Sequence, residues 1–157
     1  MSVAVLQPMH TNYALWSNNF SKSTWITSGS ASASGPNTLV LPGGYAATFQ
    51  ELVNSTVGQT WTFGLWLSGS GGGTIRVAIF DAGGSFPNSN TYCTVTTTPT
   101  RCVVTRTHSD AGATQISVHI TGYTGGDITI TAERAMIEKG PVMHNYVPTT
   151  AVTARGP

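Results

Sequence analysis

Apolar and polar residues alternate with a period of two along several stretches of this chain. The clearest stretch runs from Thr60 to Ser68 and places four large apolar side chains on one face: Trp61, Phe63, Leu65 and Leu67. A period of two is typical of a strand with one face in a hydrophobic core. The same period recurs in residues 74–81, 115–121 and 128–133. These four segments are therefore predicted to be half-buried β-strands.

Weaker patterns suggest further strands. Residues 13–20 mix aromatic and polar residues and are a candidate first strand, and residues 39–41 and 45–52 flank a Pro-Gly-Gly turn. Residues 92–95 and 101–107 are predicted to pair as a hairpin, and helical periodicity is nearly absent. Short strands separated by Gly- and Pro-rich turns favour an all-β fold. We expect an antiparallel two-sheet β-sandwich, and among sandwiches a jelly roll.

Chain length and uniform composition indicate that the whole chain forms one domain. The 157 residues show no shift in composition, and 157 residues is the usual size of a single domain. Residues 1–12 are predicted to form an irregular N-terminal arm. Gly140 and Pro141 stop the last strand, so that residues 141–157 form a C-terminal tail.

The low charge narrows the choice of partners. Only 8% of the residues are charged and the formal net charge is +1. The basic residues form no run, which argues against nucleic-acid binding. No apolar run approaches the ~20 residues of a membrane span. A surface with so little charge is poorly protected against association, so the chain is expected to lie against another protein.

Cys93 and Cys102 occupy equivalent positions in the predicted hairpin. If the hairpin loop is centred between Thr97 and Thr98, the two cysteines face each other across the strand pair, near the distance of a disulfide. The alternative is a pair of reduced thiols in a protein made in the cytoplasm. The spacing contains no CxxC motif and does not indicate a metal site.

Catalytic and cofactor motifs are missing from the sequence. The six acidic residues show no spacing that suggests an acid–base pair, and no G-x-S-x-G motif is present. We therefore expect no enzyme activity, no cofactor and no metal. Asp81, Asp110 and Asp127 each lie in a loop beside Gly or Ala and are candidate calcium ligands, although ordinary turn chemistry also explains them.

One set of side chains is a candidate binding face. By alternation, Trp66, Arg76, Phe80 and His119 lie on the non-core faces of their strands. If those strands share a sheet, the four side chains form an aromatic and polar platform of the kind that binds sugars. The alternative is that the N-terminal arm, the tail or a neighbouring subunit covers this face.

Several segments together resemble a known family. Near the N-terminus these are Leu15-Trp16-Ser17 with Phe20 and Trp25, followed by Tyr45 to Thr48 and Trp61 to Leu67. The most specific segment is the closing one, Glu138-x-Gly140 with Tyr146-x-Pro148-Thr149. The chain thus resembles the carbohydrate-binding-module-like jelly-roll domains of tailed-phage structural proteins. It departs from the family at Pro99, Thr100 and Met136.

The resemblance implies a virion protein, made in the host bacterial cytoplasm, and leaves two roles open. Because the domain fills the chain and no fibre shaft is present, the expected role is a capsid decoration (cement) protein. Its partner would be the major capsid protein, and a homotrimer is expected. The alternative is a carbohydrate-binding module of a phage tail or fibre that adheres to host surface glycans.

Overall fold

The computed structural model describes residues 9–43, 48–123 and 126–156. Within these residues, the regular secondary structure consists of β-strands and includes no helix. In chain order the strands are β1 (His10–Asn12), β2 (Ile26–Ser28), β3 (Ser32–Ala33), β4 (Thr38–Leu41), β5 (Thr48–Asn54), β6 (Thr60–Ser68), β7 (Thr74–Ala82), β8 (Asn88–Thr94), β9 (Thr100–Thr107), β10 (Gln115–Gly122), β11 (Ile128–Lys139) and β12 (Ala154–Gly156).

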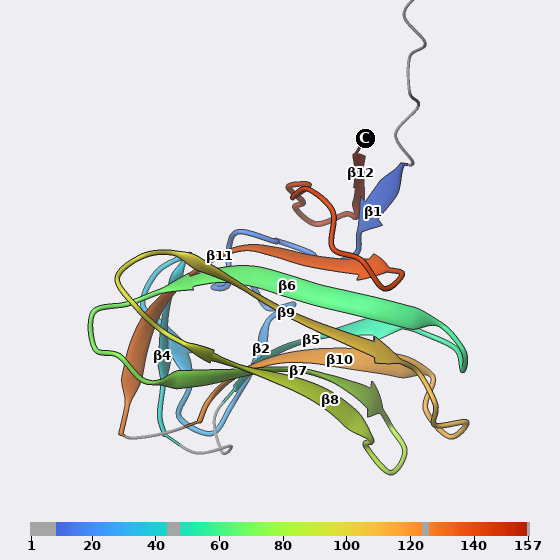
Figure 1. The fold of residues 1–157 in the computed structure, drawn as a ribbon, viewed down its shortest axis with the longest axis horizontal. Coiled ribbons are helices and arrows are strands. Elements are labelled where there is room, and N and C mark those ends of the chain that lie inside the picture. Colours follow the sequence, from blue (N-terminus) through green and yellow to red (C-terminus); the bar gives the residue numbers. More distant parts are fainter. Residues whose placement is uncertain (1–8, 44–47, 124–125, 157) are drawn as a thin grey trace, which may run out of the picture.

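Two five-stranded sheets lie face to face (Figure 1). Sheet one has the strand order β2-β5-β10-β7-β8, and sheet two has the order β3-β4-β11-β6-β9. All pairs in both sheets are antiparallel. The short strands β1 and β12 form a separate ribbon that stands off the outer side of sheet two (Figure 1). The chain is therefore an antiparallel two-sheet β-sandwich, as predicted.

The core lies between the two sheets and follows the predicted alternation. Trp61, Phe63 and Leu65 in β6 are completely buried. The same holds for the inward residues of β7 and β10: Ile75, Val77, Ile79, Ile116, Val118 and Ile120. Burying one such side chain contributes about 1.5–3 kcal/mol, so these central strands supply much of the stability of the fold.

The last strand carries a bulge that the alternation does not show. The pairing of β11 with β6 shifts between Glu133 and Met136, and Arg134 has a φ of 55°. The side chain of Asn18 accepts a hydrogen bond from the Arg134 N–H at 2.9 Å, which ties the bulge to the N-terminal segment. A bulge of this kind bends the strand and inserts one extra residue into the alternation. After Ala132, the next buried residue is therefore Ala135 and not residue 134.

The prediction of a strand in residues 13–20 is wrong. This segment is irregular, and buried side chains on it and just before it bond to residues near the other end of the chain. Asn12 donates to the carbonyl oxygens of Ala135 and Val147 at 3.0 and 2.8 Å. Ser17 Oγ accepts from the Thr149 N–H at 2.9 Å and lies 2.7 Å from the hydroxyl of Tyr146. The closing Tyr-x-Pro-Thr motif therefore anchors the tail to this segment.

The terminal segments contain more structure than predicted. Residues 10–12 of the predicted arm form β1, which pairs with β12 in the predicted tail. Residues 1–8 of the arm and residues 44–47, which include the start of the predicted strand 45–52, lie outside the described residues. Each ribbon strand has three residues, which is too short to give a periodic signal in the sequence.

The predicted hairpin of residues 92–95 and 101–107 is also wrong. The two segments belong to β8 and β9, which lie in different sheets. Cys93 pairs with Ile75 in sheet one, and Cys102 pairs with Leu65 in sheet two. The two cysteines form a disulfide with Cα atoms 6.2 Å apart, so the bond joins the sheets rather than two strands of a hairpin. The chain crosses between the sheets in residues 95–99.

Candidate functional site

The outer face of sheet one brings together three of the four predicted platform residues. Arg76 and Phe80 extend from β7, and His119 extends from β10 beside them. The rings of Phe80 and His119 lie 4.5 Å apart, and the guanidinium carbon of Arg76 lies 5.4 Å from the centre of the Phe80 ring. All three side chains are half-buried. They form a compact aromatic and cationic group at the middle of the sheet.

His119 is held in its neutral form at physiological pH. Burial lowers the pKa of His119 to about 4, and the positive charge of Arg76 adds to the shift. The His119 Nε2 atom lies 2.6 Å from the hydroxyl of Ser117. A neutral imidazole next to a hydroxyl presents a polar edge without a charge, as expected of a group that contacts an uncharged ligand.

Two tyrosines outside the set of predicted platform residues complete this face. Tyr92 in β8 pairs with Arg76, and Tyr123 follows β10. Their rings lie 4.6 Å apart at an angle of 53°, and their exposed fractions are 49% and 38%. Extending the alternation of β10 from His119 through Thr121 to Tyr123 would have identified the second tyrosine. We refer to Arg76, Phe80, Tyr92, His119 and Tyr123 as the sheet-one face.

Trp66, the fourth predicted residue, lies on the opposite sheet. It belongs to β6, where its neighbours across the strands are Glu133 and Arg101. The chain that follows β11 passes over this sheet, because Arg101 donates a hydrogen bond to the His144 carbonyl at 2.7 Å. The tail therefore contacts the outer side of the sheet that carries Trp66, at the residue that pairs with it. Alternation assigns a residue to a face of its strand but does not assign the strand to a sheet.

The three candidate calcium ligands do not form one cluster. Asp81 is fully buried and bonds through both carboxylate oxygens to Arg106, at 2.7 and 2.8 Å. Asp110 lies beside it and accepts hydrogen bonds from Ser85. Asp127 precedes β11 at the other end of the sandwich. Among the described residues, no group of three or more His, Cys, Asp or Glu side chains is arranged to hold a metal ion.

Hydrogen bonds to the Asp81 carboxylate lower its pKa and keep it ionised at neutral pH. Burial alone would raise the pKa of this carboxyl group. The Arg106 guanidinium and the backbone N–H groups of Ser109 and Asp110 outweigh burial and hold the pKa well below its usual range. Asp81 is therefore an anion at neutral pH and joins β7 to residues 106–110.

A serine and a histidine lie within hydrogen-bond distance but form part of the core. The Nδ1 atom of His108 is 2.8 Å from Ser55 Oγ, and its Nε2 atom is 3.0 Å from the Asp110 carbonyl oxygen. The indole N–H of Trp61 donates to the same hydroxyl at 2.8 Å. Ser55 is 5% exposed and His108 is 1% exposed. The hydroxyl thus satisfies two buried ring nitrogens, which is a structural role.

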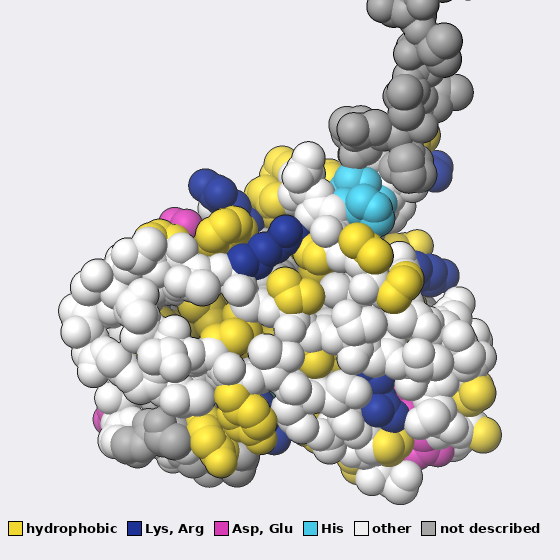
Figure 2. Space-filling model, viewed as in Figure 1, with side chains coloured by type: hydrophobic (Ala, Val, Ile, Leu, Met, Phe, Trp, Pro, Cys, Tyr) yellow, Lys and Arg dark blue, Asp and Glu magenta, His cyan; other side chains and the backbone are white. Residues whose placement is uncertain are grey.

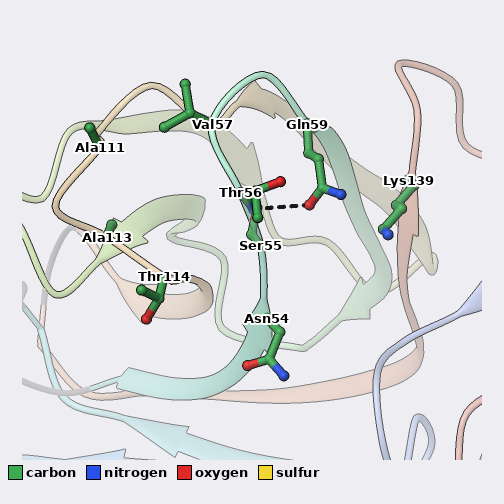
Figure 3. Close-up of a pocket in the computed structure, with 9 residues that line it drawn as sticks. All are labelled: Asn54, Ser55, Thr56, Val57, Gln59, Ala111, Ala113, Thr114 and Lys139. Atoms are coloured by element: carbon green, nitrogen blue, oxygen red, sulfur yellow. Dashed lines mark hydrogen bonds between the residues drawn. The ribbon is translucent and has the colours of Figure 1, made fainter.

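One end of the sandwich carries a hollow of about 570 Å³ (Figure 3). It lies between the loop after β5 and residues 111–114, and Lys139 at the end of β11 reaches into it. A neighbouring hollow of about 370 Å³ is lined by Tyr13, Glu51 and Lys139. Glu51 is 3% exposed, and burial raises its pKa to about 8, although a hydrogen bond from the Leu15 N–H opposes the shift. The carboxyl group of Glu51 is therefore mostly protonated at neutral pH.

The face of the molecule seen in Figure 2 carries few charged side chains. In the view of Figure 2, most of the surface is neither charged nor hydrophobic, and the Lys and Arg side chains appear as separate groups. The described part of the chain contains no helix long and apolar enough to cross a membrane.

Comparison with known proteins identifies the fold. No family model and no curated protein matches the chain. Among solved structures, the chain is similar to a CBM4 carbohydrate-binding module, with a TM-score of 0.61 and 17% identity over 83% of this chain and 94% of that one. A CBM22-1 xylan-binding domain from Paenibacillus barcinonensis Xyn10C gives 0.58 and 11%, over 82% and 92% of the two chains.

A phage protein has a similar fold. The match is to the enzymatically active domain of tailspike protein 4 from bacteriophage CBA120, with a TM-score of 0.59 and 14% identity. It covers 82% of this chain but only 21% of the tailspike chain. At such low identities these similarities establish the fold alone, which is the jelly-roll sandwich of carbohydrate-binding modules.

Proposed function

We propose that this protein is a carbohydrate-binding module that holds a glycan on the sheet-one face. The observation that carries the proposal is the exposed Tyr92–Tyr123 ring pair beside the Arg76–Phe80–His119 group. Aromatic rings stack on the C–H faces of sugars, and planar polar groups bond to their hydroxyls. Along β7, the four residue-to-residue steps from Arg76 to Phe80 span about 13 Å, so the face is longer than one sugar ring.

The similar folds favour this role over capsid decoration. Two of the similar structures are carbohydrate-binding modules, and one of these is described as xylan-binding. No observation on the described residues favours a capsid-binding surface. The proposal contains no catalytic step. The virion location, the major capsid protein as partner, the homotrimer and a host glycan as ligand stay predictions, and the tailspike similarity supports only a related fold in a phage protein.

The tyrosine pair provides the test. Tyr92→Ala is expected to weaken glycan binding at least about tenfold, because aromatic anchors dominate the affinity of small binding sites. Trp66→Ala, on the opposite sheet, is expected to leave the affinity unchanged. A glycan array identifies the ligand, and isothermal titration calorimetry compares the two variants with the wild type. If the Trp66 variant loses binding and the Tyr92 variant keeps it, the proposed face is wrong.

A further inference from the structure

Three hollows meet at Lys139 on one end of the sandwich. Their volumes are about 570, 370 and 210 Å³, and Lys139 lines all of them. The first two hollows share Asn54, and the last two share Tyr13. The hollows therefore adjoin one another around Lys139, in a series from residues 111–114 to His10 and His144. We call this series of hollows the Lys139 groove.

The walls of the first hollow differ in chemistry. Figure 3 shows Val57, Ala111 and Ala113 on one side, together with Thr114. Asn54, Gln59 and Lys139 lie on the other side, and the Lys139 amine points into the hollow. Sugars have an apolar C–H face and polar edges, so a hollow with three apolar side chains on one side and amide and ammonium groups on the other matches a sugar ring.

The charge of the groove comes from Lys139. It is the only lysine or arginine among the residues that line the three hollows. None of the described carboxylates forms an ion pair with it. Glu51 is the only acidic residue in the lining, and its raised pKa keeps it mostly neutral below about pH 8. The ammonium group of Lys139 is therefore not neutralised by the lining at pH 7.

Aromatic rings position that ammonium group. Lys139 Nζ lies 5.6 Å from the centre of the Tyr13 ring and 5.4 Å from that of the Trp61 ring. Trp61 is completely buried and bonded to Ser55, so this support is rigid. Because these cation–π contacts already restrict the lysine side chain, it loses less conformational entropy when it binds an anion.

We propose that the Lys139 groove is a second ligand site, which binds a saccharide that carries a carboxylate. The ammonium group of Lys139 binds the carboxylate, the amides of Asn54 and Gln59 bond to hydroxyls, and the wall formed by Val57, Ala111 and Ala113 contacts the C–H face of the ring. The site rests on its own lining and not on the sheet-one face, so either site can exist without the other.

The test uses trigalacturonate and its fully methyl-esterified form, which share one sugar backbone but differ in charge. In a titration of the full-length ¹⁵N-labelled protein, trigalacturonate is expected to shift the amide signals of Asn54, Gln59 and Lys139. The ester is expected to bind up to about fivefold more weakly, as for the loss of one exposed ion pair. Lys139→Gln is expected to remove the difference between the two sugars, and Lys139→Arg to keep it.

A matched variant on the other face separates this site from the proposed glycan site. Tyr92→Ala is expected to leave the shifts of Asn54, Gln59 and Lys139 unchanged. The inference is overturned if trigalacturonate causes no shifts at these three residues up to its solubility limit, if the ester binds equally well, or if Tyr92→Ala abolishes the shifts.

Discussion

Replacing Asp81 with asparagine is expected to lower the free energy of unfolding by about 3–5 kcal/mol at pH 7. The substitution removes the anion that bonds to the Arg106 guanidinium at 2.7 and 2.8 Å and leaves a cation that is only 10% exposed without its partner. Urea unfolding followed by tryptophan fluorescence measures the loss. Asp110→Asn, beside it, is the control and is expected to cost less because that carboxylate is only partly buried and bonds to Ser85 and Gly112 rather than to a buried cation.

The pH dependence of the same pair gives a second readout. The pKa of Asp81 in the folded protein is held below its value in the unfolded chain. Its contribution to stability is therefore fully present above about pH 4, where the unfolded chain is also ionised, and is lost as the pH falls towards the folded pKa. The Asp81→Asn variant lacks this group and should show a smaller loss of stability in acid. Equal acid sensitivity of the variant and the wild type would contradict the assignment.

Replacing Glu51 with glutamine is expected to stabilise the protein at neutral pH but not in acid. The pKa of Glu51 is about 8 in the folded protein and about 4.5 in the unfolded chain. Between these values the unfolded chain gains stability by ionising, so the wild type becomes less stable as the pH rises. Glutamine does not ionise, and its amide oxygen can still accept the hydrogen bond from the Leu15 N–H.

The size of this effect is obtained by comparing the free energy of unfolding of Glu51→Gln and of the wild type at two pH values. From pH 4.5 to pH 7, the stability of Glu51→Gln relative to the wild type is expected to increase by on the order of 3 kcal/mol. Any constant cost of placing an amide nitrogen at the buried Oε2 position cancels from this difference. Thermal or urea unfolding of both proteins at the two pH values measures it. Parallel curves would show that Glu51 is ionised in the folded state.

The inner faces of the long strands were predictable from the sequence, because their period of two continues for eight or nine residues. In β6, the alternation of Trp61, Phe63 and Leu65 assigned the core face correctly. The irregular segment before β2 was not predictable, because its structure depends on Asn12 and Ser17 bonding to residues more than 120 positions away. Aromatic content alone does not distinguish such a segment from a strand.

The candidate site was predicted in part, for a related reason. Alternation placed Arg76, Phe80 and His119 on outer faces correctly, but it could not show that β6 belongs to the other sheet, which removes Trp66 from the group. The spacing of Cys93 and Cys102 brings the two residues together both in a hairpin and in a crossing between sheets. The spacing of the two cysteines therefore predicted that they could bond, but it did not show that they lie in different sheets.

The central claim is that the sheet-one face binds a glycan. The most direct measurement is a crystal structure of the protein with the oligosaccharide that binds most tightly on a glycan array. We expect sugar rings stacked on Tyr92 and Tyr123, with polar contacts to Arg76 or His119. An oligosaccharide bound over Trp66 on sheet two, with the sheet-one face empty, would contradict it.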